Sequence, residues 1–435
     1  MIKFNDSRDW FFEKRFGLFI HWGLYAIRGW HEQEIWRWPV SKSEYIKYLH
    51  QFNPVKFDAD EWLDHAESAG MEYVVFTTKH CDGFCNWDSV YTDFKITNTP
   101  YGKDVLRELA QACQRRDFPL CLYYSIPDMH HPAYPHAGHP YELDTPRPDE
   151  KADKAAYLDY VRKQARELLT NYGPIHGWWW DANVMEHVDE SFHDMVRELQ
   201  PQAVINNRGF GKGDFATPER DWDNSINASK GFAAPTEACQ SIGLYAWNWK
   251  VDEDYYSDFH LKHSIAKVLS RGGNYLLNVG PMANGSFSDF STALLARIGD
   301  WKKTVAEAFT GTEPCSDLTD NGHILLTRKD NLVYVILHKP PVTNAVRLRP
   351  ISALPRKATL LNTGQPVDCL VSRLPGYGPM VDADPVLRLR NLPVNELAGD
   401  VLVIKMEFAP EDVARFTGGH QVSDGEREFS AEAYA

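Results

Sequence analysis

The sequence predicts an α/β fold: a (β/α)8-like, TIM-type barrel over residues 1–312, followed by a C-terminal antiparallel β-sandwich over residues 313–408. The barrel is predicted because short β-rich runs alternate with amphipathic helical stretches, in about six to eight such units. The sandwich is predicted because closely spaced short strands, separated by turn residues, replace this alternation after Thr312. Residues 409–435 are polar and acidic, and we expect a loosely ordered tail there.

Each element has its own local signal. Runs rich in β-branched and aromatic residues predict barrel strands at 15–20, 73–78, 120–125, 177–180, 203–206 and 275–279. Apolar residues at helical spacing predict helices at 60–69, 103–116, 151–171 and 190–200. The sandwich strands are expected at 324–327, 333–337, 346–348, 358–361, 386–389 and 401–404.

Composition excludes several classes of protein. The 435 residues carry 46 Lys+Arg and 60 Asp+Glu, and this net charge of −14 argues against a broad nucleic-acid-binding surface. No apolar run approaches the roughly 20 residues that cross a bilayer, and the N-terminus lacks a signal-peptide core. Seven scattered cysteines do not form a disulfide framework. We therefore expect a soluble, cytoplasmic protein without nucleic-acid or membrane partners, whose oligomeric state the sequence leaves open.

Aromatic residues are abundant, with 14 Trp, 20 Tyr and 22 Phe. Core packing explains most single aromatics. An indole face also accepts the apolar C–H face of a pyranose, while neighbouring polar groups bind its hydroxyls. The surplus of Trp beside polar residues thus favours a small-molecule or oligosaccharide substrate.

Chemistry-bearing residues follow five successive predicted strands. In a barrel, the carboxyl ends of the strands face the active site. The candidates there are His21, His80 with Trp87 beyond it, Tyr123, Trp179 with Asp181, and Arg208. Single residues of these types at strand ends are usually structural, but five successive ends of this kind favour a binding site.

Asp181 is the strongest catalytic candidate because it follows three consecutive Trp, where a carboxylate is costly without a partner or a function. The alternative is an N-cap for the next helix. A retaining glycosidase needs a second carboxyl about 5–5.5 Å away. The loop after Arg208 offers Glu219 and Glu237, and residue type alone does not separate these two.

The chain resembles the family 29 glycoside hydrolases, the retaining α-L-fucosidases. The segments that carry the resemblance span the predicted barrel in order: 16–23, 77–85, 122–125, 179–181, 206–208, 237–242 and 272–281. The resemblance implies a retaining exo-glycosidase that hydrolyses terminal α-L-fucose by double displacement, without a cofactor or metal. It also implies a barrel followed by a β-sandwich.

The resemblance assigns roles to individual positions. Asp181 occupies the nucleophile's place, and Glu237 occupies the place of the acid/base in many members, although Thr236 stands where the family has Trp. Glu219 remains a rival. The residues that match sugar-binding or nucleophile-holding positions are His21, His80, Tyr123, Trp179 and Arg208. The family's Glu-Trp pair is altered here: Trp36 matches the Trp, and Glu32 and Glu34 compete for the Glu, with Glu32 the first choice.

Three alternatives stay open. Cys81 replaces a second histidine of the family, and a thiol is a weak hydrogen-bond donor, so a related sugar is the first alternative. A non-catalytic carbohydrate-binding protein is the second. A metal site is the third, at the cluster of Asp128, His130, His131, His136 and His139. The prolines and the loop character of this segment instead favour histidines that cover a sugar subsite or face solvent.

Overall fold

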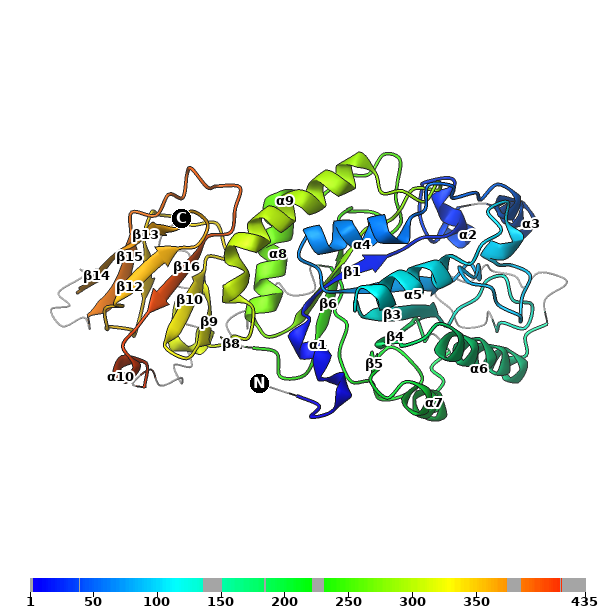
Figure 1. Cartoon of the computed structure of the whole chain (residues 1–435), viewed down its shortest axis with the longest axis horizontal. Coiled ribbons are helices and arrows are strands. Elements are labelled where there is room, and N and C mark those ends of the chain that lie inside the picture. Colours follow the sequence, from blue (N-terminus) through cyan, green and yellow to red (C-terminus); the bar gives the residue numbers. More distant parts are fainter. Residues whose placement is uncertain are drawn as a thin grey trace.

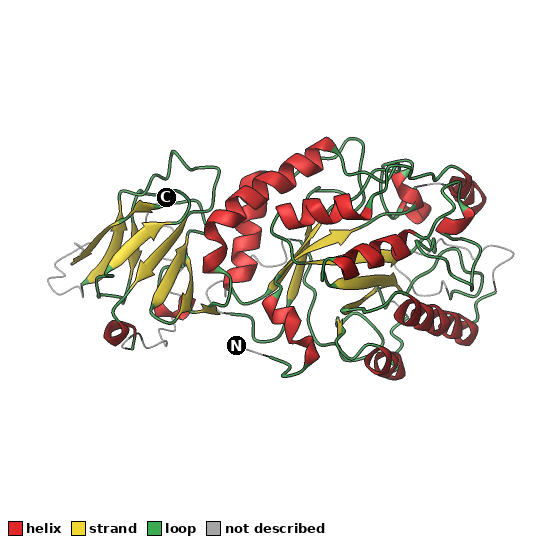
Figure 2. Cartoon of the chain, viewed as in Figure 1, coloured by secondary structure: helices red, strands yellow, loops and turns green. Residues whose placement is uncertain are grey.

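The computed structural model describes residues 3–38, 40–135, 151–183, 185–220, 231–373, 385–414 and 416. Figure 1 shows a mixed helix–strand part and, at one end of the molecule, a part built from strands. In Figure 2 the helices lie around the outside of the parallel strands of the first part. This arrangement agrees with the predicted fold class.

Seven parallel strands form one curled sheet. They are β1 (Phe16–Ile20), β2 (Tyr73–Lys79), β3 (Leu120–Ser125), β4 (Gly177–Asp181), β5 (Val204–Ile205), β6 (Glu237–Ser241) and β7 (Asn274–Asn278). Their order across the sheet is β5-β4-β3-β2-β1-β7-β6. Six of the seven agree closely with the predicted runs, whereas β6 lies in a region where the sequence suggests a loop.

Residues 214–220, which we call the closing segment, lie between the two edge strands β5 and β6. They make parallel bridges to both edges, at Asn206–Phe215, Ala216–Thr236 and Glu219–Cys239. The segment is not a regular strand, since Pro218 has no main-chain N–H to donate. Its Pro218 carbonyl still accepts from the Cys239 N–H at 3.0 Å. The closing segment thereby fills the eighth position and joins the sheet into a barrel.

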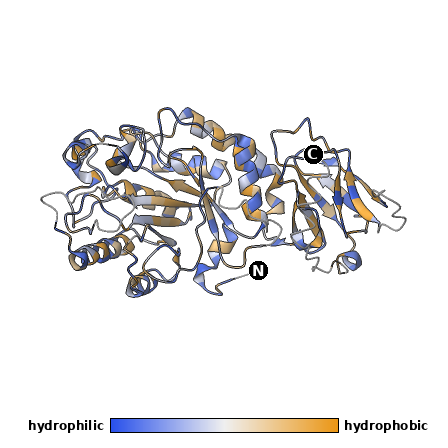
Figure 3. Cartoon of the chain, turned by 180° about the vertical axis from the view of Figure 1, so that it is seen from behind, coloured by the Kyte–Doolittle hydropathy of each residue, from blue (hydrophilic) through white to orange (hydrophobic). Residues whose placement is uncertain are grey.

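Amphipathic helices cover the outside of the barrel. The longer ones are α4 (Ala59–Ser68), α5 (Val105–Arg115), α6 (Lys154–Asn171), α7 (Ser191–Leu199), α8 (Asp258–Ser270) and α9 (Asp289–Val305), and short helices α1 (Trp10–Glu13), α2 (Glu34–Arg37) and α3 (Lys42–Tyr45) lie in the N-terminal part. In Figure 3 the barrel strands are largely apolar, and the helices have both apolar and polar faces. In α5, Asp104 caps the first turn by accepting from the Arg107 N–H at 3.0 Å.

The barrel interior is packed with aromatic and aliphatic side chains. Phe19, Tyr73, Tyr123, Trp179 and Leu276 belong to one buried cluster, and each is at most 3% exposed. A filled interior leaves space for a ligand only at the carboxyl ends of the strands.

The second part contains two antiparallel sheets around a separate core. Their orders are β13-β12-β16-β10-β9-β8 and β11-β15-β14. The strands are β8 (Glu313–Pro314), β9 (Leu325–Lys329), β10 (Leu332–Ile336), β11 (Val346–Leu348), β12 (Lys357–Leu360), β13 (Gln365–Pro366), β14 (Asp368–Ser372), β15 (Val386–Arg390) and β16 (Val403–Glu407), followed by the short helix α10 (Pro410–Val413).

The sandwich packs against α8 and α9 of the barrel (Figure 1). The Trp301 indole N–H of α9 donates to the Val401 carbonyl at 3.2 Å, and Lys262 of α8 pairs with Asp400 at 2.5 Å. No helix in the described part of the chain is long and apolar enough to cross a membrane.

Candidate active site

Asp181 is the last residue of β4, at the carboxyl end of the barrel, where its side chain is 24% exposed. Both carboxylate oxygens are bound. The Tyr123 hydroxyl donates to Oδ2 at 2.6 Å, and Arg208 Nη1 donates to Oδ1 at 3.2 Å. Burial, together with the Asp181 charge, raises the pKa of Tyr123 well above its ordinary value, so this hydroxyl stays a donor. Asp181 is thus an oriented carboxylate that is accessible from the site.

Glu219 of the closing segment shares the same guanidinium. Its Oε1 accepts from Arg208 Nη1 at 2.8 Å, and its side chain is 44% exposed. Because one nitrogen binds both carboxylates, the two bound oxygens are at most about 6 Å apart, which is compatible with the 5–5.5 Å separation of a retaining pair. Burial opposes the Arg208 charge, but Asp181 and Glu219 raise the pKa of Arg208 above its ordinary value.

Arg208 is itself fixed by the closing segment. Its Nε donates to Thr217 Oγ1 at 2.6 Å, its Nη2 donates to the Thr217 carbonyl at 2.8 Å, and its guanidinium stacks over the Trp179 ring at 4.8 Å. This rigid fork sets the relative position of the two carboxylates. An open hollow of about 350 Å³ lies beside it, lined by Asn207, Arg208, Ala216, Thr217, Pro218, Phe232 and Thr236.

Glu237 lies elsewhere. It is the first residue of β6, at the amino end of the strand, and not in a loop as the sequence suggests. Its side chain is 2% exposed, and its carboxylate accepts from the Tyr73 hydroxyl at 2.6 Å and from the Trp179 indole N–H at 3.0 Å. Burial raises its pKa to about 7. The structure therefore places Glu237 in the barrel core, at the N–H edge of the Trp179 ring, while Glu219 shares Arg208 with Asp181.

The two predicted sugar-binding histidines lie together. His21 and His80 are nearly buried, with ring centroids 5.6 Å apart, and both rings contact Tyr123. His21 Nδ1 is 2.7 Å from Asn278 Oδ1. Asn278 Nδ2 donates to Ser241 Oγ and the Trp247 carbonyl, so Oδ1 is the acceptor and His21 Nδ1 carries the proton. The lone pair of His21 is then on Nε2.

Both histidines are held in the neutral form. Burial lowers the pKa of His21 well below its ordinary value, with the His80 charge contributing. Burial also lowers the pKa of His80, although Glu32 and Asp181 work in the opposite direction. Cys81 Sγ lies 2.9 Å from His80 Nδ1, and burial raises the pKa of this thiol well above its ordinary value. The residue that departs from the family pattern therefore contacts a site histidine.

Glu32, not Glu34, belongs to this cluster. Glu32 is 1% exposed, and its Oε2 accepts from the main-chain N–H groups of Trp247 and Asn248 at 2.9 and 3.4 Å. Glu34 instead contacts Arg28 and Tyr48 at 3.3 and 3.1 Å. The main chain of Trp36 lies in α2, but its side chain is outside the described part of the structure.

Two of the tryptophans predicted to bind substrate, Trp179 and Trp87, are buried and packed against other side chains. Trp179 is 3% exposed, with Tyr123 stacked on it at 5.5 Å and Arg208 over its ring, so it forms the floor beneath Asp181. Trp87 is fully buried, and its indole N–H donates to Glu167 of α6 at 2.7 Å. The prediction that Trp87 binds substrate is not supported, because its ring packs under a helix outside the strands.

The histidine-rich loop does not assemble a metal site among the described residues. Asp128 accepts from the His130 and His131 main-chain N–H groups and pairs with buried Lys79 at 3.1 Å. The His130 ring stacks on Phe94 at 4.1 Å. His136 and His139 lie outside the described residues.

Sequence reasoning did not single out two residues that hold the site together, Asn278 and Trp247. Asn278 ends β7 and orients His21, and its place at a strand end is the signal that identifies it. The Trp247 ring lies 5.3 Å from His21, with the Arg220 guanidinium 4.8 Å from its centre. It follows β6, so it could be recognised only once that strand was known.

Comparison with known proteins shows the family to which this chain is similar. The family model described as alpha-L-fucosidase matches residues 2–307. The chain is 26% identical over 393 residues to the tissue alpha-L-fucosidase of Homo sapiens, covering 82% of each chain. Among solved structures, it is similar to alpha-L-fucosidase isoenzyme 1 from Paenibacillus thiaminolyticus, with a TM-score of 0.80, 32% identity and coverage of 93% of this chain and 99% of that one.

A second similar structure is a family 29 alpha-L-fucosidase from Bacteroides thetaiotaomicron, trapped as a covalent intermediate with 2-fluoro-fucosyl fluoride. Its TM-score is 0.79, at 27% identity, and the match covers 93% of this chain and 97% of that one. The family model spans more than half of the chain, and the fold of these relatives extends across both of its parts. The chain belongs to the α-L-fucosidase family of glycoside hydrolases, family 29.

Proposed function

We propose that this protein is an exo-acting retaining α-L-fucosidase, with Asp181 as nucleophile and Glu219, in place of Glu237, as acid/base. The observation that carries the assignment is the Arg208 guanidinium nitrogen, which binds an oxygen of each carboxylate at the carboxyl end of the barrel. Glu237 has both oxygens bound by core donors at the amino end of its strand. It is therefore held as a structural carboxyl.

In the first step, Asp181 attacks the anomeric carbon of the sugar. The bond from that carbon to the aglycone oxygen breaks, and Glu219 gives its proton to this oxygen. Tyr123 and Arg208 hold the attacking carboxylate in one orientation, which reduces the cost of reaching the reactive geometry. The product of this step is a fucosyl ester of Asp181 and a free alcohol.

In the second step, Glu219 takes a proton from water while the water oxygen attacks the anomeric carbon. The bond to Asp181 breaks, and the sugar leaves with its original anomeric configuration after two inversions. The exposure of Glu219 supports this role, because the acid/base must reach both the leaving aglycone and the incoming water.

Recognition of the sugar rests on the two histidines. His21 Nε2 has the lone pair and can accept a hydrogen bond from a sugar hydroxyl, because Asn278 fixes its tautomer. Glu32 contributes a buried carboxylate beside His80. Neutral imidazoles and a fixed carboxylate suit hydroxyl groups better than a charged ligand. This supports a fucoside, as a small glycoside or an oligosaccharide, as the substrate.

The proposal is tested with the purified protein and a panel of aryl glycosides that includes α-L-fucoside, α-L-rhamnoside, β-D-galactoside and α-L-arabinoside. We expect hydrolysis of the α-L-fucoside, with proton NMR showing the α-anomer as the first product. Hydrolysis of another member alone redirects the assignment to a related sugar, which is the possibility raised by Cys81. If the protein binds fucose but hydrolyses none of the glycosides, the proposed catalysis is contradicted and the protein is a carbohydrate-binding protein.

A further inference from the structure

The closing segment carries Glu219 and is joined to its neighbours by main-chain hydrogen bonds, but it does not form a regular ladder. Three isolated bridges join it to β5 and β6, and Pro218 interrupts its donors. Phe215 lies in the core, and Thr217 and Glu219 both contact Arg208, so alternate residues face inward. Because side chains in an extended segment alternate, a slip of one residue turns Glu219 away from the site. The contacts that fix the register of this segment therefore also decide whether Glu219 faces the site.

Asp214, at the start of the segment, makes the required contacts. Its main-chain N–H donates to the Ile205 carbonyl at 2.6 Å, and its side-chain Oδ2 accepts from the Ile205 N–H at 2.8 Å. The N–H and the carbonyl of Ile205, the last residue of β5, thus both hydrogen-bond to Asp214. The carboxylate takes the place of a neighbouring strand's carbonyl, so this pairing is available at one register only.

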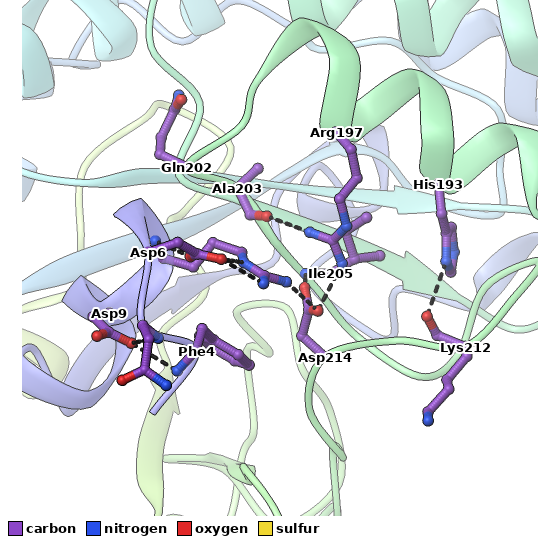
Figure 4. A network of polar contacts seen from close by, with 12 residues as sticks. Phe4, Asp6, Asp9, His193, Arg197, Gln202, Ala203, Ile205, Lys212 and Asp214 are labelled. Atoms are coloured by element: carbon purple, nitrogen blue, oxygen red, sulfur yellow. Dashed lines mark hydrogen bonds and ion pairs between the residues drawn. The ribbon is translucent and has the colours of Figure 1, made fainter. Parts of the chain in front are cut away.

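Two arginines hold the other oxygen of that carboxylate. Arg8 Nη1 and Arg197 Nη2 donate to Asp214 Oδ1 at 2.7 and 2.6 Å, and the Asp214 side chain is 9% exposed. Figure 4 shows Asp214 between Arg197 of α7 and the N-terminal segment that carries Asp6. Arg197 also donates to the Ala203 carbonyl at 3.1 Å, which ties the same cluster to the chain entering β5.

The N-terminal segment presents Arg8 in a fixed orientation. Arg8 Nε and Nη2 donate to Asp6 at 3.0 and 2.7 Å, and its guanidinium stacks on Phe4 at 4.5 Å. Asp9 in turn accepts from the Phe4 and Asn5 N–H groups at 2.8 and 3.1 Å. Contacts within the N-terminal segment therefore hold the Arg8 side chain in the orientation in which it binds Asp214.

We infer that Asp214, clamped by Arg8 and Arg197, is a positioning residue for the acid/base: it fixes the register of the closing segment so that Glu219 faces Asp181. This inference rests on the proposed function, because it concerns the placement of the proposed acid/base. It also gives the N-terminal segment a part in catalysis, through the contact of Arg8 with Asp214.

The test uses the full chain with Asp214→Asn and Arg8→Gln, and two substrates that differ in leaving group. A dinitrophenyl α-L-fucoside needs little acid assistance, whereas methyl α-L-fucoside depends on it. For Asp214→Asn we expect kcat/KM for the methyl fucoside to fall about 10-fold or more and that for the dinitrophenyl fucoside to change less than about 2-fold. Arg8→Gln, which keeps the carboxylate, shows the same pattern at about 3-fold.

A second readout is azide. When the acid/base is displaced, azide attacks the anomeric carbon of the fucosyl-enzyme, the bond to Asp181 breaks, and fucosyl azide forms without base assistance. We expect azide to accelerate turnover of the dinitrophenyl fucoside in both variants, and fucosyl azide to appear by mass spectrometry. The matched control is Arg297→Gln, which removes another partly exposed Arg–Asp pair, at 2.5 Å to Asp258, and leaves both readouts unchanged.

The outcomes separate the two claims. If Glu219→Ala shows neither leaving-group selectivity nor azide rescue, the acid/base assignment fails and the role of Asp214 fails with it. If Glu219→Ala shows both, but Asp214→Asn and Arg8→Gln lower both substrates equally or neither, the clamp is only structural and the inference is overturned. Should Asp214→Asn not fold, the milder Arg8→Gln decides by the same criterion.

Discussion

Asp181 and Glu219 bind the same atom: Arg208 Nη1 lies 3.2 Å from Oδ1 of the first and 2.8 Å from Oε1 of the second. The two residues come from positions that are not adjacent in the barrel, the end of β4 and the closing segment. The shared guanidinium nitrogen therefore fixes how the two carboxylates lie relative to each other. Once Asp181 is esterified it loses its charge, and the cation then stabilises ionised Glu219 for the second step.

Replacement of Asp181 by Gly removes the proposed nucleophile and leaves the other residues of the site in place. We expect turnover of aryl α-L-fucosides to fall at least about 1000-fold, since no covalent intermediate can form. In the unaltered protein, 2-fluoro-fucosyl fluoride should add one fluorofucosyl group to the peptide that contains Asp181, as peptide mass spectrometry would show. Labelling of a different residue disproves this assignment.

Glu237 links the stability of the barrel to pH. Its pKa is raised by burial from 4.5 to about 7, so the folded state retains a proton that the unfolded chain releases. The stabilisation from this proton is present below pH 4.5 and is lost as pH rises through about 7. Glu237→Gln mimics the protonated form, because its amide can accept from Trp179 and donate to Tyr73.

We therefore expect Glu237→Gln to raise the free energy of unfolding relative to the parent by about 1–3 kcal/mol at pH 8, and to leave it nearly unchanged at pH 4.5. Urea unfolding at the two pH values measures this. A variant that is equally destabilised at both pH values contradicts a structural, protonated Glu237.

Cys81 is expected to set the tautomer of His80. Its neutral thiol can donate to Nδ1 at 2.9 Å, and the proton of the imidazole is then on Nε2, complementary to the lone pair on His21 Nε2. Cys81→Ala removes this donor, and we expect KM for an aryl α-L-fucoside to rise about 3- to 10-fold. Cys81→Ser keeps a donor and should restore most of the affinity. Equal KM values for the parent and both variants argue against the contact.

Trp87→Phe separates a core residue from a sugar-binding one. The indole N–H that binds the buried Glu167 is lost, so the free energy of unfolding should fall by about 1–3 kcal/mol. KM for the fucoside should be unchanged, because Trp87 is fully buried under α6. Thermal unfolding and steady-state kinetics on one preparation give both values. A raised KM with intact stability reverses the conclusion.

The fold and most of the strand-end residues could be predicted from local patterns. The strand that ends near Trp180, and the site positions of His21 and Arg208, can be predicted from the sequence. The reason is that the residues that follow each β-rich run lie at the same end of a barrel. The closing segment could not be recognised, since it contains a proline and lacks the apolar run that marks the other barrel strands. It becomes a barrel element only through β5 and β6, and with it Glu219 enters the site.

The position of Glu237 in a strand could not be predicted for a related reason. The run Glu237–Ser241 is too polar to be recognised as a buried strand, and its amino end carries a carboxylate that only the Tyr73 and Trp179 donors stabilise. Those donors come from residues 164 and 58 positions away in sequence. Trp87 follows His80 closely in sequence, but it lies beyond β2, and its buried indole N–H donates to Glu167 of α6.

The central claim, that Asp181 works with Glu219 and not with Glu237, is tested most directly by comparing Glu219→Ala with Glu237→Gln. The measurement is kcat/KM for methyl and dinitrophenyl α-L-fucosides. The account predicts that Glu219→Ala loses about 100-fold or more on the methyl fucoside while largely retaining the dinitrophenyl substrate, and that Glu237→Gln changes both by similar small factors. Selective loss in Glu237→Gln, with Glu219→Ala unaffected, would contradict it.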